Sequence, residues 1–150
     1  MSNIQAGLPV FLLVLGCSAL AFAAGPEAIG TVKYVEGGAA IRQGGQSIDA
    51  AVGSPVHLND NLATDAEGSI GITIKDGTLL SLGPDSEMEI DELVYDPARK
   101  NVGLNVNVAH GTFLYFSGRI AKVNPQAVTV KTPNAVIGIR GTRFLLNVAE

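Results

Sequence analysis

The sequence predicts an all-β domain, and three observations carry that prediction. Eighteen glycines and seven prolines in 150 residues indicate many turns and few long helices. Apolar and polar residues alternate, as in Ser69–Ile74 and Val102–Val108, whereas nothing after Gly25 repeats apolar residues at helical spacing. Turn-forming residues separate these segments at short intervals. We therefore expect many short strands joined by Gly, Pro and Asn turns, in a solenoid-like coiled sheet or a sandwich.

The expected strands run along the chain from about residue 30 to its last residues, each bounded by turn residues. They are Thr31–Val35, Ala39–Gln43, Ser69–Ile74, Thr78–Leu82, Met88–Ile90, Val102–Val108, Gly111–Phe116, Ala127–Lys131 and Arg143–Val148. The stretch Pro97–Lys100 alone suggests a helical turn in this part of the chain.

A three-residue hairpin loop is expected at residues 75–77. That loop length sets Ile72 opposite Leu80 and gathers the apolar residues of both strands on one face. The arrangement is a turn closed by a glycine in the left-handed region, followed by a bulge. We therefore predict a positive φ for Gly77.

A second hairpin of the same kind is expected at residues 109–111, where Val106 would face Leu114 and Gly111 would have a positive φ. A Gly-Thr pair opens a strand here, as it does at Gly77 and at Gly141. This recurrence is either a simple way to enter a strand after a tight turn or the sign of a repeated strand–turn–strand unit.

Residues 1–23 are expected to be a secretory signal peptide. The first charged side chain is Glu27, Leu8–Leu15 is apolar, and Ala21-Phe22-Ala23 fits a cleavage site after Ala23. Two alternatives stay open: lipidation of Cys17, which follows a lipobox-like Val-Leu-Gly, and an uncleaved membrane anchor. Each exports the domain, so we expect the periplasm or another extracytoplasmic location, with a membrane-anchored lipoprotein as the alternative.

Composition excludes several kinds of chemistry. The net charge is −4 with no basic stripe, so no nucleic-acid partner is expected. One cysteine and two histidines allow no intrachain disulfide and hardly a zinc site. Nucleophile elbows and phosphate-binding loops are missing from the sequence. We therefore expect no enzyme, no cofactor and no metal site; His57 and His110 are taken as surface residues, and a hydrolase is kept only as a control hypothesis.

Acidic residues cluster between residues 85 and 96. Asp85, Glu87, Glu89 and Asp91 alternate with other residues and so line one face of a strand. A flat strand face does not by itself converge oxygens on a calcium ion. We interpret the cluster as a solvated face that also protects a sheet edge.

Two features could form a recognition surface. In the register expected for the second hairpin, Phe113 and Tyr115 point away from the Leu104 and Val106 face. They are either a second buried layer or an exposed docking patch for a partner, and we take them as the candidate patch. Arg140 lies in a glycine-flanked turn, where it either satisfies turn carbonyls or projects as an anchor for a carboxylate.

Four stretches, taken in order, resemble the FecR domain, the periplasmic β-module of ferric-citrate-type signalling regulators. They are Gly53–Thr64, Gly68–Leu82, Ser86–Ile90 and Val130–Phe144. The last is the most specific, because so long an ordered pattern, closing on Arg-Gly-Thr-Arg-Phe, is rare by chance. In the first, Asn59-Asp60-Asn61 stands where the family usually has Gly-Asp. The resemblance implies a FecR-like β-domain over residues 29–148.

Regulators that this chain resembles have a cytoplasmic anti-sigma segment and a membrane helix before the periplasmic domain. We expect no cytoplasmic segment here, so the family's best-known signalling route is not carried over. The expected function is an exported, non-enzymatic domain that binds another envelope protein in signalling or assembly. The alternative is a structural module, or one that binds glycan or the cell wall, with no signalling role.

Overall fold

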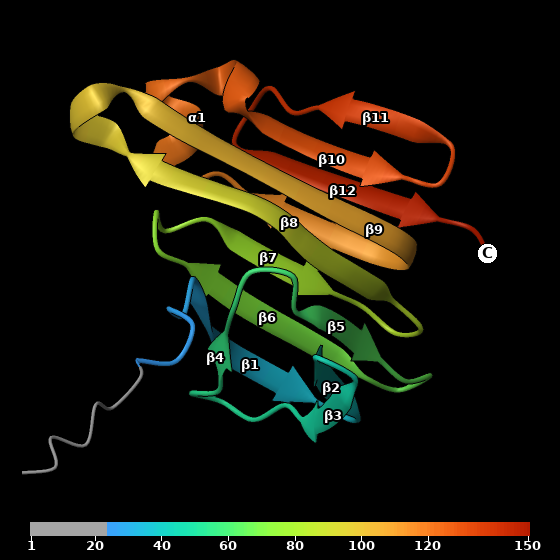
Figure 1. Ribbon diagram of the computed structural model, residues 1–150. Helices are drawn as coiled ribbons and strands as arrows, with labels where there is room; N and C mark the ends of the chain where they lie inside the picture. The colour runs from blue at the N-terminus through green and yellow to red at the C-terminus, as the bar shows by residue number, and fades with distance from the viewer. Residues whose placement is uncertain (1–23) are drawn as a thin grey trace, which may run out of the picture.

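The computed structural model describes residues 24–150, so the predicted signal peptide and Cys17 lie outside the described residues. Twelve strands make up most of this part of the chain, with one short α-helix and two 3-10 turns (Figure 1). The strands are β1 Gly30–Glu36, β2 Ala39–Gln43, β3 Gln46–Asp49, β4 Pro55–Val56, β5 Asn61–Thr64, β6 Ser69–Ile74, β7 Leu79–Leu82, β8 Glu87–Asp96, β9 Asn101–Phe116, β10 Val128–Thr132, β11 Ala135–Gly138 and β12 Arg143–Val148. The helical elements are η1 Pro97–Arg99, α1 Arg119–Val123 and η2 Pro125–Ala127.

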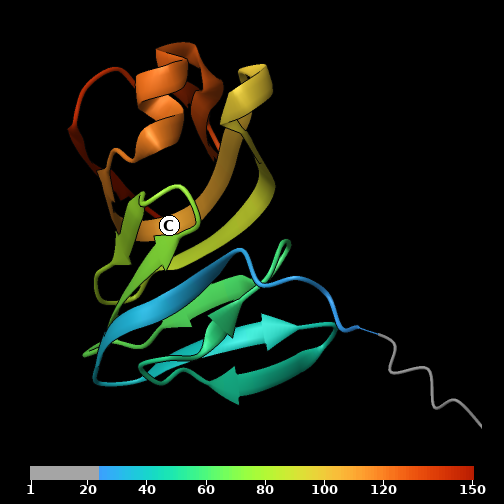
Figure 2. The same cartoon turned by 90° about the vertical axis from the view of Figure 1, so that its left-hand side faces the viewer.

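All twelve strands join in one sheet that curls into an open half-barrel, which confirms the all-β prediction. We divide the sheet into two halves. Half A contains β4, β1, β6, β7, the C-terminal part of β9 and β12. Half B contains β3, β2, β5, β8, the N-terminal part of β9, β10 and β11. Figure 2 shows how the C-terminal elements, orange and red, stand at the opposite end of the molecule from β1–β3.

The core lies on the concave side of the curled sheet, where the inward residues of both halves meet. Val32 and Leu80 of half A and Val106 of half B are fully buried in one apolar cluster. Ile120 of α1 closes this cluster at one end and is also fully buried. Among residues 24–150, no helix has the length and apolar character that crossing a membrane requires.

Three of the expected strands, 39–43, 69–74 and 143–148, have the predicted bounds. Four strands were missed, namely β3, β4, β5 and β11, each with four residues or fewer, whereas β7 was predicted at the same length. The helical turn at Pro97 is confirmed as η1, but α1 was not predicted. Five residues contain too little of a helical repeat to be recognised.

The hairpin at residues 75–77 is confirmed. Ile72 pairs with Leu80, and Gly77 has φ +86°. Its amide donates to the Ile74 carbonyl, which closes the turn. The expected register and turn chemistry were therefore both correct.

The hairpin at residues 109–111 was wrong, although Gly111 does have a positive φ, +91°. β9 continues through this glycine as one strand, pairing first with β8 and then with β7. The left-handed residue here bends the strand from half B into half A, as a bulge does, and does not reverse it.

Candidate functional site

Four chain segments cross from one half of the sheet to the other along one line, which we call the fold line. They are residues 37–38, 65–68, 83–86 and Gly111. Hydrogen bonds join neighbouring crossings: Asp65 N to the Gly38 carbonyl at 3.0 Å and Asp85 N to the Asp65 carbonyl at 2.9 Å. The fold line is thus a continuous polar seam that sets the curl of the sheet.

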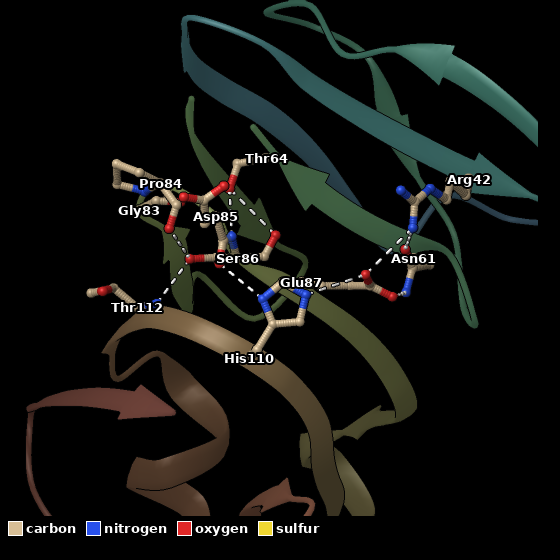
Figure 3. A network of polar contacts seen from close by, with 10 residues as sticks. All are labelled: Arg42, Asn61, Thr64, Gly83, Pro84, Asp85, Ser86, Glu87, His110 and Thr112. Carbon is tan, nitrogen blue, oxygen red and sulfur yellow. Dashed lines mark hydrogen bonds and ion pairs between the residues drawn. The ribbon is translucent and has the colours of Figure 1, made fainter. Parts of the chain in front are cut away.

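Ser86, in the third crossing, holds the fourth crossing at Gly111 in place (Figure 3). Its Oγ donates to the Pro84 carbonyl at 2.9 Å and accepts from the Thr112 amide at 2.8 Å. A Cβ on Gly111 would lie 2.1 Å from the Ser86 Oγ, so only glycine fits at this point of β9. The buried Ser86 hydroxyl thus donates one hydrogen bond and accepts another, both to backbone groups that join β8 to β9 and to the preceding turn.

His110 belongs to the same seam and is part-buried. Its Nδ1 lies 2.9 Å from the Asp85 carbonyl oxygen and therefore carries a proton that it donates there. Its Nε2 lies 3.7 Å from Glu87 Oε2, and Glu87 also accepts from Asn61 at 2.8 Å and lies 3.4 Å from Arg42 (Figure 3). The imidazole joins β9 to β8, and its side chain is still 29 % exposed, so it is a surface residue held in place by hydrogen bonding.

His57 is likewise held in place, in the loop between β4 and β5. Gln43 Nε2 lies 2.7 Å from both His57 Nδ1 and Asp60 Oδ2, and can donate one hydrogen to each. Ser54, directly before β4, accepts from the Ala51 amide at 3.1 Å through its Oγ. No hydrogen bond joins Ser54 to His57 within residues 24–150, and His57 and Asp60 form a polar anchor just after β4.

Asp76 is a buried carboxylate that the sequence analysis did not single out. Its Oδ1 accepts from the Thr78 amide at 2.9 Å, and its Oδ2 accepts from the Thr78 hydroxyl at 2.7 Å and the Ile120 amide at 3.0 Å. The carboxylate therefore caps the N-terminus of α1 from a turn more than forty residues earlier. This contact docks the C-terminal elements on half A.

The expectation that Phe113 and Tyr115 form a docking patch was wrong. Both side chains are 0 % exposed, so the alternative of a buried layer is the correct one. The register explains the error: because β9 does not reverse at Gly111, these residues point into the core between β7 and β12. Burial, together with the nearby Asp76 carboxylate, raises the pKa of Tyr115 to about 12.

The interpretation of the acidic cluster was half correct. Met88 and Ile90 are buried while Glu87 and Glu89 are only part-buried, so the alternation is confirmed. The strand is not at an edge, however, because β8 lies between β5 and β9. Its carboxylates contact Arg42, Asn61 and Asn105 on neighbouring elements and do not guard a free edge.

Arg140 lies in the loop that leads from β11 to β12. The loop is fixed on both sides of it, since Ile139 is buried and the Thr142 carbonyl accepts from the Ser117 amide at 2.9 Å. The Arg140 side chain is exposed, and none of the ion pairs found in residues 24–150 involves it. A fixed backbone therefore presents a guanidinium to the surroundings of the domain.

A groove of about 530 Å³ lies close to this end of the molecule. β10 pairs with β9 as far as Asn107, and β12 pairs with it from Gly111, so neither covers residues 108–110. The groove opens over this gap and is walled mainly by Pro133, Ile137, Leu146 and Val148. Val136 and Leu145, at 71 % and 65 % exposed, precede Ile137 and Leu146 in their strands and therefore point to the opposite face from the groove.

Charge divides the chain into two parts that the sequence analysis did not separate. Residues 119–150, which we call the C-terminal unit, carry five Lys or Arg and one Glu. Residues 24–118, which we call the body, carry five Lys or Arg and thirteen Asp or Glu. A count by segment would have revealed this asymmetry, whereas the overall net charge of −4 conceals it.

The fold and these contacts define an all-β module whose histidines and buried serine join neighbouring strands and loops, and whose C-terminal unit is basic beside an acidic body. The FecR protein family model matches residues 60–150, and the chain belongs to that family. FecR is a regulatory, non-enzymatic family whose domains are typically extracytoplasmic. No curated protein and no solved structure gave a significant match in the comparisons.

Proposed function

We propose that this FecR domain is a non-catalytic module that binds another protein of the cell envelope, in signalling or in assembly of the envelope. The observation that carries the proposal is the surface of the C-terminal unit. That unit carries the exposed apolar side chains of Val136 and Leu145 and the guanidinium of Arg140, which takes part in none of the ion pairs found in residues 24–150. It also lines a groove next to residues 109–110 of β9. Exposed apolar anchors and arginine are typical of protein interfaces.

The proposal gives the partner a defined chemistry. The C-terminal unit is basic, so a partner surface with Asp or Glu around an apolar centre complements it in charge and in hydrophobicity. No nucleic acid is proposed as the partner, since the five Lys and Arg side chains of the C-terminal unit are scattered and do not form a basic stripe that follows a phosphate backbone.

Site-specific photo-crosslinking in intact cells tests the proposal. A crosslinking residue placed at Leu145 is expected to capture a discrete protein band. The matched control is Val52, which is equally exposed at 68 % but lies in the body, and it should capture little. Equal capture at both positions would refute the localised interface, and recovery only with insoluble envelope would favour the structural or glycan-binding alternative.

The location of the domain is part of the same proposal. We propose export to the periplasm with loss of residues 1–23, or anchoring through a lipid on Cys17. The intact mass of the protein recovered from the envelope distinguishes these outcomes. A chain starting at Ala24 supports cleavage, whereas added acyl mass supports the lipoprotein.

A further inference from the structure

The two ends of half B are free strand edges. β3 pairs only with β2 and β11 pairs only with β10, within the part of the chain that the structure describes. Each has four residues, and they lie at opposite ends of the molecule in Figure 1, with β11 at the top and β3 at the bottom. Each therefore presents unpaired backbone groups to the surroundings.

Both edge strands are short, but neither carries a lysine, a proline or a bulge. β11 contains no charged residue and no proline, and the only charge in β3 is Asp49. Both expose large apolar side chains, Ile48 at 50 % and Val136 at 71 %. β11 is apolar throughout, and β3 presents one isoleucine among polar residues; a free edge without lysine, proline or a bulge can accept an added strand.

Strand directions allow a second copy to extend this sheet. Within half B each strand from β3 to β9 runs antiparallel to its neighbour, β10 runs parallel to β9, and β11 runs antiparallel to β10. Following these directions across half B shows that β3 and β11 run in opposite senses. If a second copy is placed beside the first by translation alone, its β3 lies antiparallel to β11 of the first copy. The core faces of the two copies then lie on the same side of the joined sheet.

The side-chain pattern fixes one register for this pairing. In one cross-strand row, Ile48 of β3 pairs with Ile41 of β2, which in turn pairs with Leu62 of β5. In a second row, at the other edge, Ile137 of β11 pairs with Val130 of β10. Ile41, Leu62 and Val130 are buried, so Ile48 and Ile137 both belong to the core face. Pairing Ile48 with Ile137 of the next copy joins the two rows into one apolar row.

Charge also favours contact between unlike ends. The C-terminal unit, which contains β11, has a net charge of +4, and the body, which contains β3, has −8. In the register above, Asp49 faces Val136 on the outer face, so the junction places no like charges opposite each other. Two β3 edges, by contrast, would bring two acidic bodies together.

We infer that the domain associates head to tail with further copies of itself, β3 of one copy adding to β11 of the next to form a continuous sheet. Such a heterologous contact does not close on itself and produces open chains of copies. The inference shares β11 with the proposed envelope interface, but it is tested on purified protein alone, so either can fail without the other.

Sedimentation velocity on the full chain and two variants tests the inference. In Ile48→Lys the lysine blocks the β3 edge, and in Ile137→Lys it blocks the β11 edge. We expect wild type to form species beyond dimers as its concentration rises from about 10 µM to 1 mM, the range of weak contacts. Each variant alone should stay monomeric, while an equal mixture should form a dimer, because each variant keeps the edge that the other lacks.

Three results would overturn the inference: a wild type that stays monomeric, a mixture that stays monomeric, or a loss of association in only one variant, which indicates a symmetric contact. Thermal unfolding confirms that each variant is folded. If Ile137→Lys does not fold, Val136→Asp replaces it, because it sets a carboxylate opposite Asp49 of the neighbouring copy. All samples share the same N-terminal residues, so association through those residues would appear in both variants and count against the sheet contact.

Discussion

The body and the C-terminal unit use their polar groups in opposite ways. In the body, Ser86 and Asp76 are buried and fully engaged in hydrogen bonds between distant segments. In the C-terminal unit, Arg140 is exposed on a fixed loop and the edge of β11 is unpaired. The difference teaches that Ser86 and Asp76 join distant segments of the sheet, whereas Arg140 and the β11 edge of the C-terminal unit are left available for contacts with other molecules.

The largest expected effect is that of Tyr115→Ala in the core of the body. Removing a fully buried aromatic ring costs about 3–5 kcal/mol of unfolding free energy, through lost burial and the cavity left behind. Urea denaturation measures this cost. Tyr34→Ala is the control, since Tyr34 is largely exposed and its loss should cost far less. Equal effects would show that the aromatic strand is not core.

Asp76→Ala should come next, at about 3 kcal/mol, because it leaves the Thr78 and Ile120 donors buried without a partner. Asp96→Ala is the matched control: Asp96 also caps a short helical element, η1, but at an exposed site. Its loss should cost under about 1 kcal/mol. A small effect at Asp76 would mean that α1 is held by packing alone.

Gly111→Ala should cost about 2 kcal/mol or more, from left-handed strain and from the clash of its Cβ with Ser86 Oγ. Gly45→Ala separates the two contributions, because Gly45 has φ +85° but no atom within 4 Å of an added Cβ. The excess cost at Gly111 then measures the tightness of the fold line. If both variants lose the same free energy, the fold line tolerates a methyl group.

Alkaline pH should affect the body through Tyr115. Its pKa is raised to about 12 in the folded chain, so an unfolded chain with an ordinary pKa near 10 loses its proton first. The stability that this group contributes is complete below about pH 10 and declines between about pH 10 and 12. Tyr115→Phe should remove that decline, so the difference in unfolding free energy between variant and wild type must change over this interval. A constant difference would contradict the burial of the phenol.

Local pattern explains what the sequence could predict. The 75–77 hairpin followed from apolar alternation on both sides of a left-handed glycine, because only one loop length aligns Ile72 with Leu80. Gly111 carries the same local signal but bends a strand, because β7 and β12 both pair with the residues after it. Whether Gly111 bends or reverses the chain therefore depends on strands that are distant in sequence. The same choice decides whether Tyr115 lies on the surface or in the core.

The Asp76 cap was beyond prediction for the same reason, since its partner in α1 lies far along the chain. The basic surface of the C-terminal unit, which the sequence analysis missed, is a different case. The basic character of residues 119–150 can be counted directly from the sequence, and only their exposure required the structure.

The central claim is that the C-terminal unit, and not the body, carries the partner interface. Reversing two of its exposed charges, with Arg140→Glu and Arg143→Glu together, should change the unfolding free energy by about 1 kcal/mol or less. Within residues 24–150 neither side chain forms an ion pair, and Arg143 contacts the Phe116 ring. The matched control is Lys33→Glu with Lys100→Glu, which reverses two exposed charges of the body.

The deciding measurement is the yield of the protein captured by a photo-crosslinker at Leu145 in cells carrying each double variant. We predict at least a tenfold loss for the Arg140 and Arg143 variant, equivalent to about 1.4 kcal/mol of binding, and an unchanged yield for the Lys33 and Lys100 variant. Unchanged capture in the first variant, or an equal loss in both, would contradict the account.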